Sequence, residues 1–255
     1  MFMKQKIKKF TNKILDLIYP KNIKCIFCAE ELNQNDYNCT CEKCLEILPF
    51  IEKHCERCGS PMNENQKGVC FKCKKHNYYF TKTRSVFEYG GLALKVVHNA
   101  KYNGAKYLLE HMAKYVAEVY STMGVFPDFI TYVPMFPSKE KARGYNQSKV
   151  LAEYLSERVD VPLIDCCIKA IDTKSQTELN TIERIENIKD SFKFNKEFKD
   201  KIKGKTIMIV DDVITTGATI SEISRVLCEN GVRECFGVSF AHTKLEQMDF
   251  EFKGN

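Results

Sequence analysis

The sequence lacks the segments that would place the protein in a membrane or direct its export. No uninterrupted apolar run approaches the roughly 18 residues that a membrane span requires. The N-terminus is basic, but Asn12, Lys13 and Asp16 interrupt the apolar core that a signal peptide would need, and no small-residue cleavage site follows. We therefore expect a cytoplasmic protein without a membrane span.

Acidic residues are slightly fewer than basic ones. The 39 lysines and arginines against 33 aspartates and glutamates give a formal net charge of +6. Such an excess suits anionic partners without demanding nucleic acid. The chain has 255 residues, 44% of them hydrophobic, which is enough for a real core and for more than one domain.

Cysteine, by contrast, is abundant, with 13 in the chain. Eight of them form four C-x-x-C pairs, and because nothing directs export, the pairs predict metal binding in a reducing compartment rather than disulfides. Two pairs together complete a tetrahedral Zn²⁺ site of four thiolates. The spacing predicts two successive zinc ribbons, formed by Cys25, Cys28, Cys41 and Cys44 and by Cys55, Cys58, Cys70 and Cys73.

We expect both zinc ions to be structural, because four thiolates leave no coordination position open. The stretch is too short to build a stable core alone, and structural zinc supplies on the order of 10 kcal/mol or more to folding. Cys39 could compete for the first site, whereas His54 and His76 are expected to be bystanders of the second. Reduced thiols without metal are the alternative.

Residues 1–20 form a candidate amphipathic helix with a lysine-rich face, ended by Pro20. Such a helix could lie on a membrane surface or touch nucleic acid. The alternative is a helix that packs on its own protein and keeps its lysines in solvent.

The most informative stretch is IMIVDDVITTGAT, residues 207–219. Ile207–Val210 form a short apolar run typical of a strand buried on both faces of a parallel sheet. Asp211 and Asp212 follow, then a loop of threonine and glycine, and then an amphipathic helix. The loop therefore lies at a helix N-terminus, where free amides favour an anion. A phosphate held there, beside carboxylates that accept hydrogen bonds from a diol, describes a ribose 5-phosphate.

This stretch resembles the phosphoribosyl pyrophosphate (PRPP) signature of type I phosphoribosyltransferases, in which apolar residues precede two acids and a Thr-Thr-Gly-x-Thr loop. The resemblance implies that Asp211 and Asp212 hold the ribose hydroxyls and orient the ring for catalysis. It implies that the 5′-phosphate is held by Thr215, Thr216, Gly217, Ala218 and Thr219. The alternative is a buried acidic strand end beside an ordinary helix cap.

A second strand end in the same domain is also suited to an anion. Residues 128–133 predict a strand that stops at Pro134, and the polar loop after it carries Lys139 and Arg143. A basic loop at the end of a parallel strand suits a pyrophosphate, so we expect both residues to contribute to PRPP binding. With further strands expected at 83–89 and 235–243, the pattern predicts an α/β domain of the type I phosphoribosyltransferase kind.

The stretch Arg-Gly-Tyr-Asn-Gln-Ser at 143–148 is similar to the ComF competence-protein family, which there reads Arg-Gly-aromatic-Asn-Gln. The lysine-tyrosine-x-glycine at 101–104, the tandem cysteine pairs and the segment SQTELNTIERIEN at 175–187 agree with that family. The match covers nearly the full chain. One departure is Lys169, which stands where the family usually has arginine and lacks the bidentate geometry for phosphate.

The segment 172–203 is polar and longer than an ordinary connection. It could be a mobile lid over the site, with Gln176 and Arg184 as contact residues and Arg184 as a catalytic candidate. The alternative is an exposed helix with no catalytic part.

We expect three regions: a basic helix over 1–20, a tandem zinc-ribbon domain over 21–79 and a phosphoribosyltransferase-like domain over 80–255. The aromatic run Tyr78–Phe80 at the second boundary could stack on bases or pack in the core.

Different classes of function follow. The ComF resemblance implies a cytoplasmic protein that binds PRPP and zinc and helps natural transformation by handling incoming single-stranded DNA. An active phosphoribosyltransferase of nucleotide salvage or biosynthesis is the alternative, in which Mg²⁺ and basic side chains neutralise the leaving pyrophosphate. In a third possibility, the ribbons dock a DNA-processing partner such as a helicase. No residue pattern selects the acceptor.

Overall fold

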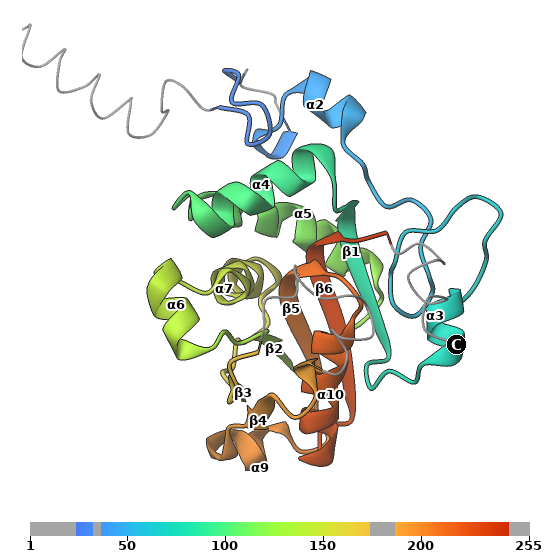
Figure 1. The fold of residues 1–255 in the computed structure, drawn as a ribbon, viewed down its shortest axis with the longest axis vertical. Helices are drawn as coiled ribbons and strands as arrows, with labels where there is room; N and C mark the ends of the chain where they lie inside the picture. Colours follow the sequence, from blue (N-terminus) through green and yellow to red (C-terminus); the bar gives the residue numbers. More distant parts are fainter. Residues whose placement is uncertain (1–23, 33–36, 174–186, 245–255) are drawn as a thin grey trace, which may run out of the picture. The chain divides into compact units, whose positions relative to one another are not determined.

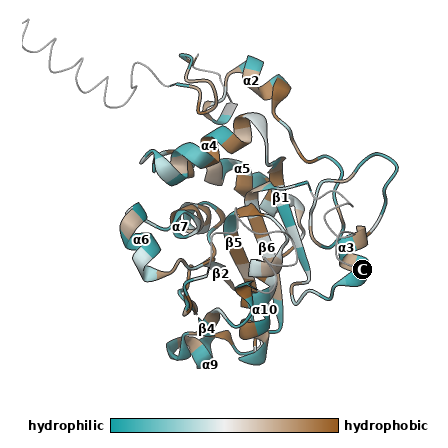
Figure 2. Ribbon diagram, in the orientation of Figure 1, coloured by the Kyte–Doolittle hydropathy of each residue, from teal (hydrophilic) through white to brown (hydrophobic). Residues whose placement is uncertain are grey.

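A parallel sheet is organised around one buried strand, β5 (Thr206–Ile214). Its strands follow the order β1 (Lys82–Glu88), β6 (Glu234–His242), β5 and β2 (Phe129–Tyr132), each parallel to its neighbours (Figure 1). The four residues from Ile207 to Val210 have 0% exposed surface, and β5 is brown, for hydrophobic residues, in Figure 2. The predicted parallel α/β fold is thereby confirmed.

The computed structural model describes residues 24–32, 37–173 and 187–244. No helix in these ranges is long and apolar enough to cross a membrane. Packing divides the chain into two units, residues 1–47 and residues 48–255. The boundary expected from composition between residues 79 and 80 stays a prediction, and the expected N-terminal helix lies outside the described residues.

Helices cover both faces of the sheet. The longest in the described ranges are α4 (Gly91–Tyr102), α5 (Leu108–Thr122), α7 (Gln147–Val159) and α10 (Ala218–Glu229). On β6, the ring of Phe240 packs near Tyr115 of α5, whereas a Cβ on Gly237 would lie 2.9 Å from Ile220 of α10. Because successive strand residues alternate between faces, α5 and α10 lie on opposite sides of the sheet.

The connection after β2 differs from expectation. The expected polar loop contains a short helix, α6 (Pro137–Arg143). Pro137 lies in the first turn of the helix, which suits its fixed φ, and Gly144, at φ 88°, ends the helix in the left-handed conformation. Lys139 and Arg143 are therefore held on a helix rather than on a loop.

The segment 172–203 also contains more regular structure than expected. The strand β4 (Phe192–Phe194) pairs antiparallel with β3 (Cys167–Lys169), and η3 (Lys196–Phe198) and α9 (Lys199–Ile202) follow. The cause is a set of apolar residues spaced through the polar segment. Ile188, Phe192 and Ile202 are all buried in the core.

In the smaller unit, two cysteine pairs come together without a large core. A short antiparallel bridge between Lys24 and Glu31 frames the turn of the first pair. The segment η1 (Tyr37–Cys39) then leads to α2 (Glu42–Ile47), which carries Cys44. This small amount of regular structure agrees with folding that depends on metal.

The second cysteine set belongs to the core of the larger unit. Cys55 and Cys58 have 0% exposed surface, and α3 (Phe71–Lys75) carries Cys73. Gly59 allows a close approach to β1, since its φ is +67° and a Cβ there would lie 2.5 Å from the Thr83 carbonyl oxygen. The Thr83 hydroxyl donates to the Cys58 carbonyl oxygen at 2.7 Å. The second ribbon therefore packs directly on the sheet.

Because only the second set packs in the core of the larger unit, losing a cysteine from each set should have different effects on the stability of that unit. Cys55→Ser should release zinc from the second set and lower the free energy of unfolding of the larger unit by on the order of 3 kcal/mol or more. Cys25→Ser is the matched control: it should release zinc from the first set and leave the larger unit's unfolding midpoint unchanged. Zinc content and thermal unfolding followed by near-ultraviolet circular dichroism check both. A Cys55→Ser protein that loses zinc but keeps the wild-type midpoint would contradict the prediction.

Candidate functional site

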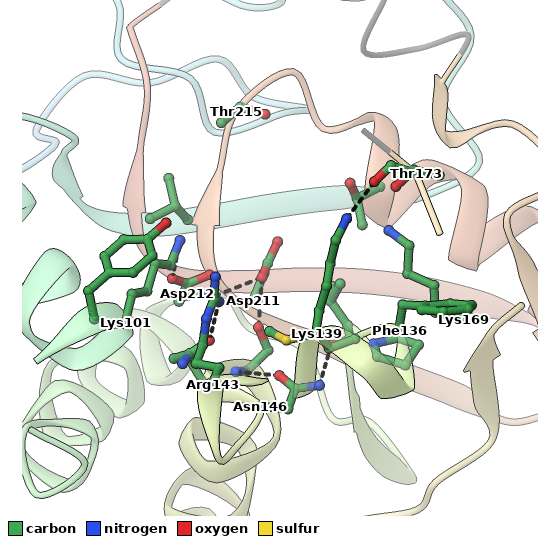
Figure 3. Close-up of a pocket in the computed structure, with 18 of the residues that line it drawn as sticks. Lys101, Phe136, Lys139, Arg143, Asn146, Lys169, Thr173, Asp211, Asp212 and Thr215 are labelled. Carbon is green, nitrogen blue, oxygen red and sulfur yellow. Dashed lines mark hydrogen bonds and ion pairs between the residues drawn. The ribbon is translucent and has the colours of Figure 1, made fainter. Parts of the chain in front are cut away.

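A cavity of about 750 Å³ opens at the carboxyl ends of β5 and β2, where ligands bind in open α/β sheets. Figure 3 shows side chains from several elements converging on it. Among the residues predicted from the sequence, the cavity is lined by Asp211, Asp212, Thr215, Thr219, Lys139 and Arg143. The two predicted anion sites and the acid pair thus share one cavity.

The two carboxylates near the carboxyl end of β5 have different partners. Ser148 of α7 donates its hydroxyl to Asp211 Oδ1 at 2.8 Å, and the Asp212 backbone N–H donates to the same oxygen at 2.9 Å. Lys101, near the end of α4, places its Nζ 2.6 Å from Asp212 Oδ2 (Figure 3). Only 22% and 11% of these two side chains are exposed. Two helices therefore position the acid pair.

The pKa values of Asp211 and Lys101 are both shifted by burial and by charged neighbours. Burial and the neighbouring Asp212 carboxylate raise the pKa of Asp211 to about 7, although the Ser148 hydrogen bond acts to lower it. Burial acts to lower the pKa of Lys101, but the Asp212 and Asp211 carboxylates outweigh burial, so that pKa is raised. Near neutral pH, the Asp211 carboxyl is therefore partly protonated, whereas the Lys101 ammonium stays charged.

The raised pKa of Asp211 predicts a pH dependence with a definite sign. The unfolded aspartate loses its proton near pH 3.8, whereas the folded one keeps it up to about pH 7. Between these values the native state binds the extra proton, so this group lowers the free energy of unfolding as pH rises, by at most about 1.4 kcal/mol per pH unit.

Asp211→Asn cannot titrate and should lack this fall. Urea unfolding of both proteins from about pH 4 to about pH 8 should show the variant's stability relative to wild type increasing up to about pH 7 and then levelling off. A difference that stays constant over the range would contradict the raised pKa.

The loop after β5 is shaped by its glycine. Gly217 has φ +77°, a left-handed conformation that glycine adopts at little cost. α10 begins directly after it, and Thr216 Oγ1 accepts a hydrogen bond from the Ala218 N–H at 3.3 Å. Thr215 and Thr219 line the cavity. Of the five predicted phosphate-binding residues, Thr216, Gly217 and Ala218 thus build the turn. The other two, Thr215 and Thr219, line the cavity.

The chain leaving the second cysteine set supports this loop. The Tyr78 hydroxyl donates to the Thr216 carbonyl oxygen at 3.1 Å. Phe80 lies close enough that a Cβ on Gly217 would be 3.4 Å from its ring. Tyr78 and Phe80 stack with ring centroids 4.9 Å apart and are buried, whereas Tyr79 is exposed. Base stacking and core packing were the two roles considered for this aromatic run, and Tyr78 and Phe80 pack in the core.

The second predicted anion site lies beside the end of β2. Lys139 of α6 donates to the Thr173 carbonyl oxygen at 2.6 Å and pairs with Asp172 at 2.7 Å. Arg143 donates to Gln147 Oε1 at 2.8 Å. Lys139 is therefore partly neutralised by a carboxylate, whereas the hydrogen-bond partner of Arg143 is neutral.

Lys169, where the ComF family usually has arginine, also lines the cavity. Burial and the nearby charge of Lys139 lower the pKa of Lys169 to about 8. Its ammonium lies 5.2 Å from the centroid of the Phe192 ring. An anion bound beside it would favour the charged form, because an opposite charge raises the pKa of a lysine.

The cavity also contains residues that were assigned no role from the sequence, among them Lys101, Asn146 and Ser148. Asn146 caps α7 by accepting from the Ser148 N–H at 3.0 Å, and it donates to the Val133 carbonyl oxygen at 3.0 Å. These bonds fix where Ser148 meets Asp211. The signals were the KYNG and RGYNQS motifs, which contain all three residues.

Arg184 and Gln176, the predicted lid contacts, lie outside the described residues, so their roles stay predictions. The segment after them is anchored on α10. The Asp190 N–H donates to Glu222 Oε1 at 2.8 Å, and Arg225 pairs with the Asp190 carboxylate at 2.9 Å.

Each predicted zinc-ligand set forms a four-cysteine group. Within each set the sulfur atoms all lie within 4.8 Å of one another, close enough to share one ion. Cys39, His54 and His76 belong to neither group. The Lys72 ammonium, near the second set, is buried without a hydrogen-bond partner among the described residues. Zinc with four thiolates is an anionic centre that would balance this charge, so the donor set fits structural zinc.

Two domain models match the chain. Residues 14–74 match the double zinc ribbon domain, and residues 146–249 match the phosphoribosyl transferase domain. Together with the parallel sheet and the four-cysteine groups, these matches define a phosphoribosyltransferase-type α/β protein with an N-terminal double zinc ribbon.

Curated relatives align with the chain over most of their length. Competence protein F of Haemophilus influenzae is 28% identical over 221 residues, which cover 84% of this chain and 94% of the relative. Competence protein ComFC of Bacillus subtilis is 27% identical over 75% of this chain and 78% of its own. DNA utilization protein YhgH of Escherichia coli K12 is 25% identical over 75% of this chain and 85% of its own. The resemblance to the ComF family is confirmed.

Proposed function

We propose that the protein binds PRPP in the cavity at the ends of β5 and β2, and that it uses this site in the cytoplasm to handle incoming single-stranded DNA. The observation that carries the first part is the meeting of an acid pair and a threonine-glycine loop in one cavity. The phosphoribosyl transferase match supports the same ligand. The relatives named for competence and DNA utilization support the second part.

In the proposed complex, the ribose hydroxyls donate hydrogen bonds to Asp211 and Asp212. The 5′-phosphate accepts hydrogen bonds from loop 215–219 at the N-terminus of α10. Lys139 and Arg143 contact the pyrophosphate. Lys101 stabilises this arrangement, because its ammonium offsets the repulsion between the acid pair and the phosphates.

Magnesium would accompany the pyrophosphate. Asp211 and Asp212 offer the carboxylate oxygens that this ion takes directly or through its water ligands, so this pair would hold it. Bound magnesium would neutralise charge on the pyrophosphate. Lys101 already supplies one positive charge beside Asp212, which limits how much further neutralisation the acid pair requires.

Catalysis of phosphoribosyl transfer is a second candidate function. An acceptor nitrogen would form a bond to ribose C1 while the bond from C1 to the pyrophosphate oxygen breaks. The bonding electrons would leave with pyrophosphate, and the acceptor would lose its proton to water. The gathering of Lys139, Arg143 and Lys169 around the cavity favours this candidate, since cations stabilise a departing pyrophosphate. Arg184 stays the predicted catalytic residue of the segment 172–203.

Partners other than PRPP are proposed from charge and from the relatives' names. Single-stranded DNA suits the net charge of +6, and binding through phosphates would weaken steeply with added salt. A DNA-processing protein docked on the ribbons is the other proposed partner.

Calorimetric titration of zinc-loaded protein with PRPP and magnesium tests the ligand. Wild type should bind, and the double variant Asp211→Asn/Asp212→Asn should bind at least about tenfold more weakly, because two charged acceptors of ribose hydrogen bonds are lost. Asp160→Asn is the matched control: the residue has φ 53°, which asparagine tolerates, and it does not line the cavity.

Folded, zinc-loaded wild type that binds no PRPP would overturn the proposed ligand. If PRPP binds, a search for acceptors that release pyrophosphate separates the two candidate functions. Magnesium-dependent release with a nucleobase or an amine would establish transfer.

Tyr78→Phe should weaken PRPP binding although Tyr78 does not line the cavity. The change removes one hydrogen bond to the Thr216 carbonyl oxygen, so about 1 kcal/mol of support for the phosphate loop is lost. Affinity should fall several-fold with zinc content unchanged. Tyr79→Phe is the control, because Tyr79 is 56% exposed. Equal effects of the two substitutions on affinity would contradict a specific role for the Tyr78 hydroxyl.

A further inference from the structure

An aromatic and basic patch borders the cavity where α4 leads into α5. Tyr102 and Tyr107 expose 59% and 66% of their surface, and the exposed Lys106 lies between them in the chain. Tyr102 lines the cavity, and the Arg143 guanidinium lies 5.2 Å from the centroid of its ring. An exposed ring at a cavity mouth offers a flat apolar face that a ligand entering the cavity can cover.

The patch is held in place by contacts between its elements. The Tyr145 hydroxyl donates to the carbonyl oxygen of Ala100, which ties the connection between α6 and α7 to the last turn of α4. His98, one turn before Tyr102, places its ring 4.8 Å from the Tyr102 ring. Arg143 contacts the same ring from α6. Tyr102 is therefore oriented by two helices.

We propose that Tyr102, with Arg143 against its ring, forms a subsite for a nucleobase at the mouth of the cavity. An aromatic ring beside a guanidinium attracts planar heteroaromatic rings by stacking and by cation–π interaction. The position agrees with this ligand class, because Tyr102 lines the same cavity as Asp211 and Asp212. The subsite rests on the proposed function for its ribose-phosphate part, which lies beside it in the same cavity.

The base can come from two sources that share this chemistry. A free base or mononucleotide would use Tyr102 alone, as the acceptor or the product of transfer. A single strand would present several bases, and Lys106 and Tyr107 would extend the surface beyond the cavity. Tyr107 does not line the cavity, so Tyr107→Ala should weaken binding of a strand and leave a mononucleotide unaffected.

The test compares ligands with and without a base on the full, zinc-loaded chain. The probes are ribose 5-phosphate, AMP, a 5′-phosphorylated oligothymidylate of about eight nucleotides and an abasic strand of the same length. The variants are Tyr102→Ala, Tyr102→Phe and Tyr107→Ala, each checked for zinc content and circular dichroism. Equilibrium dissociation constants are measured at one fixed salt concentration, because phosphate contacts depend on salt.

We expect wild type to bind AMP more tightly than ribose 5-phosphate. Tyr102→Ala should weaken AMP binding roughly 5- to 150-fold, the range of one base stack, and leave ribose 5-phosphate unchanged. Tyr102→Phe keeps the ring and should retain AMP binding. The same loss on the oligothymidylate but not on the abasic strand would identify single-stranded DNA as a source of the base.

Several outcomes would overturn the subsite. These are equal binding of AMP and ribose 5-phosphate by wild type, a Tyr102→Ala effect of the same size on both, and an equal loss of AMP binding in Tyr107→Ala. Failure of the proposed function looks different. Wild type would then bind neither PRPP nor ribose 5-phosphate, and the comparison of oligothymidylate with the abasic strand in Tyr102→Ala would still decide the base subsite.

Discussion

Two adjacent carboxylates at the end of an apolar strand are the constraint around which this site is built. Burying charge costs free energy unless partners compensate for it. Here the compensation comes from two helices: Ser148 of α7 hydrogen-bonds Asp211, and Lys101 of α4 pairs with Asp212. Both helices must therefore dock correctly for β5 to carry two acids near its carboxyl end. The same lysine lowers the negative potential that an incoming phosphate meets, so one ion pair serves both the fold and the site.

The second cysteine set shows the same coupling of stability to site geometry. It packs on β1 through Gly59 and Thr83, and the chain leaving it places Tyr78 and Phe80 against the loop at the start of α10. A loop that binds phosphate needs its amides fixed before the ligand arrives, because ordering them on binding would cost affinity. A metal-stabilised ribbon supplies a rigid support for that loop. Zinc bound to this set would therefore contribute to the site without contacting the ligand.

Predictions from sequence succeeded where the signal is local. The apolar run Ile207–Val210 predicted a buried parallel strand, and the C-x-x-C spacing predicted which cysteines come together. Contacts between segments far apart in the chain left no such signal. The pairing of Lys101 with Asp212 and the support of Thr216 by Tyr78 depend on how helices and ribbon dock on the sheet. α6 was missed for a different reason, because the polar composition of its sequence suggested a loop and outweighed Pro137 as a sign of a helix start.

Charge and aromatic surface are divided within the cavity, and this division bears on what the protein does. The acid pair, the threonine loop and the lysines occupy the strand ends and suit ribose and phosphates, whereas Tyr102 offers ring surface at the mouth. Recognition of the sugar phosphate and recognition of a base therefore depend on different residues, and either can be lost without the other. A transferase and a DNA-handling protein both need these two kinds of recognition. What separates them is whether the base meets ribose C1 as a free acceptor or remains part of a strand, and Tyr107, outside the cavity, is placed to contact only the strand.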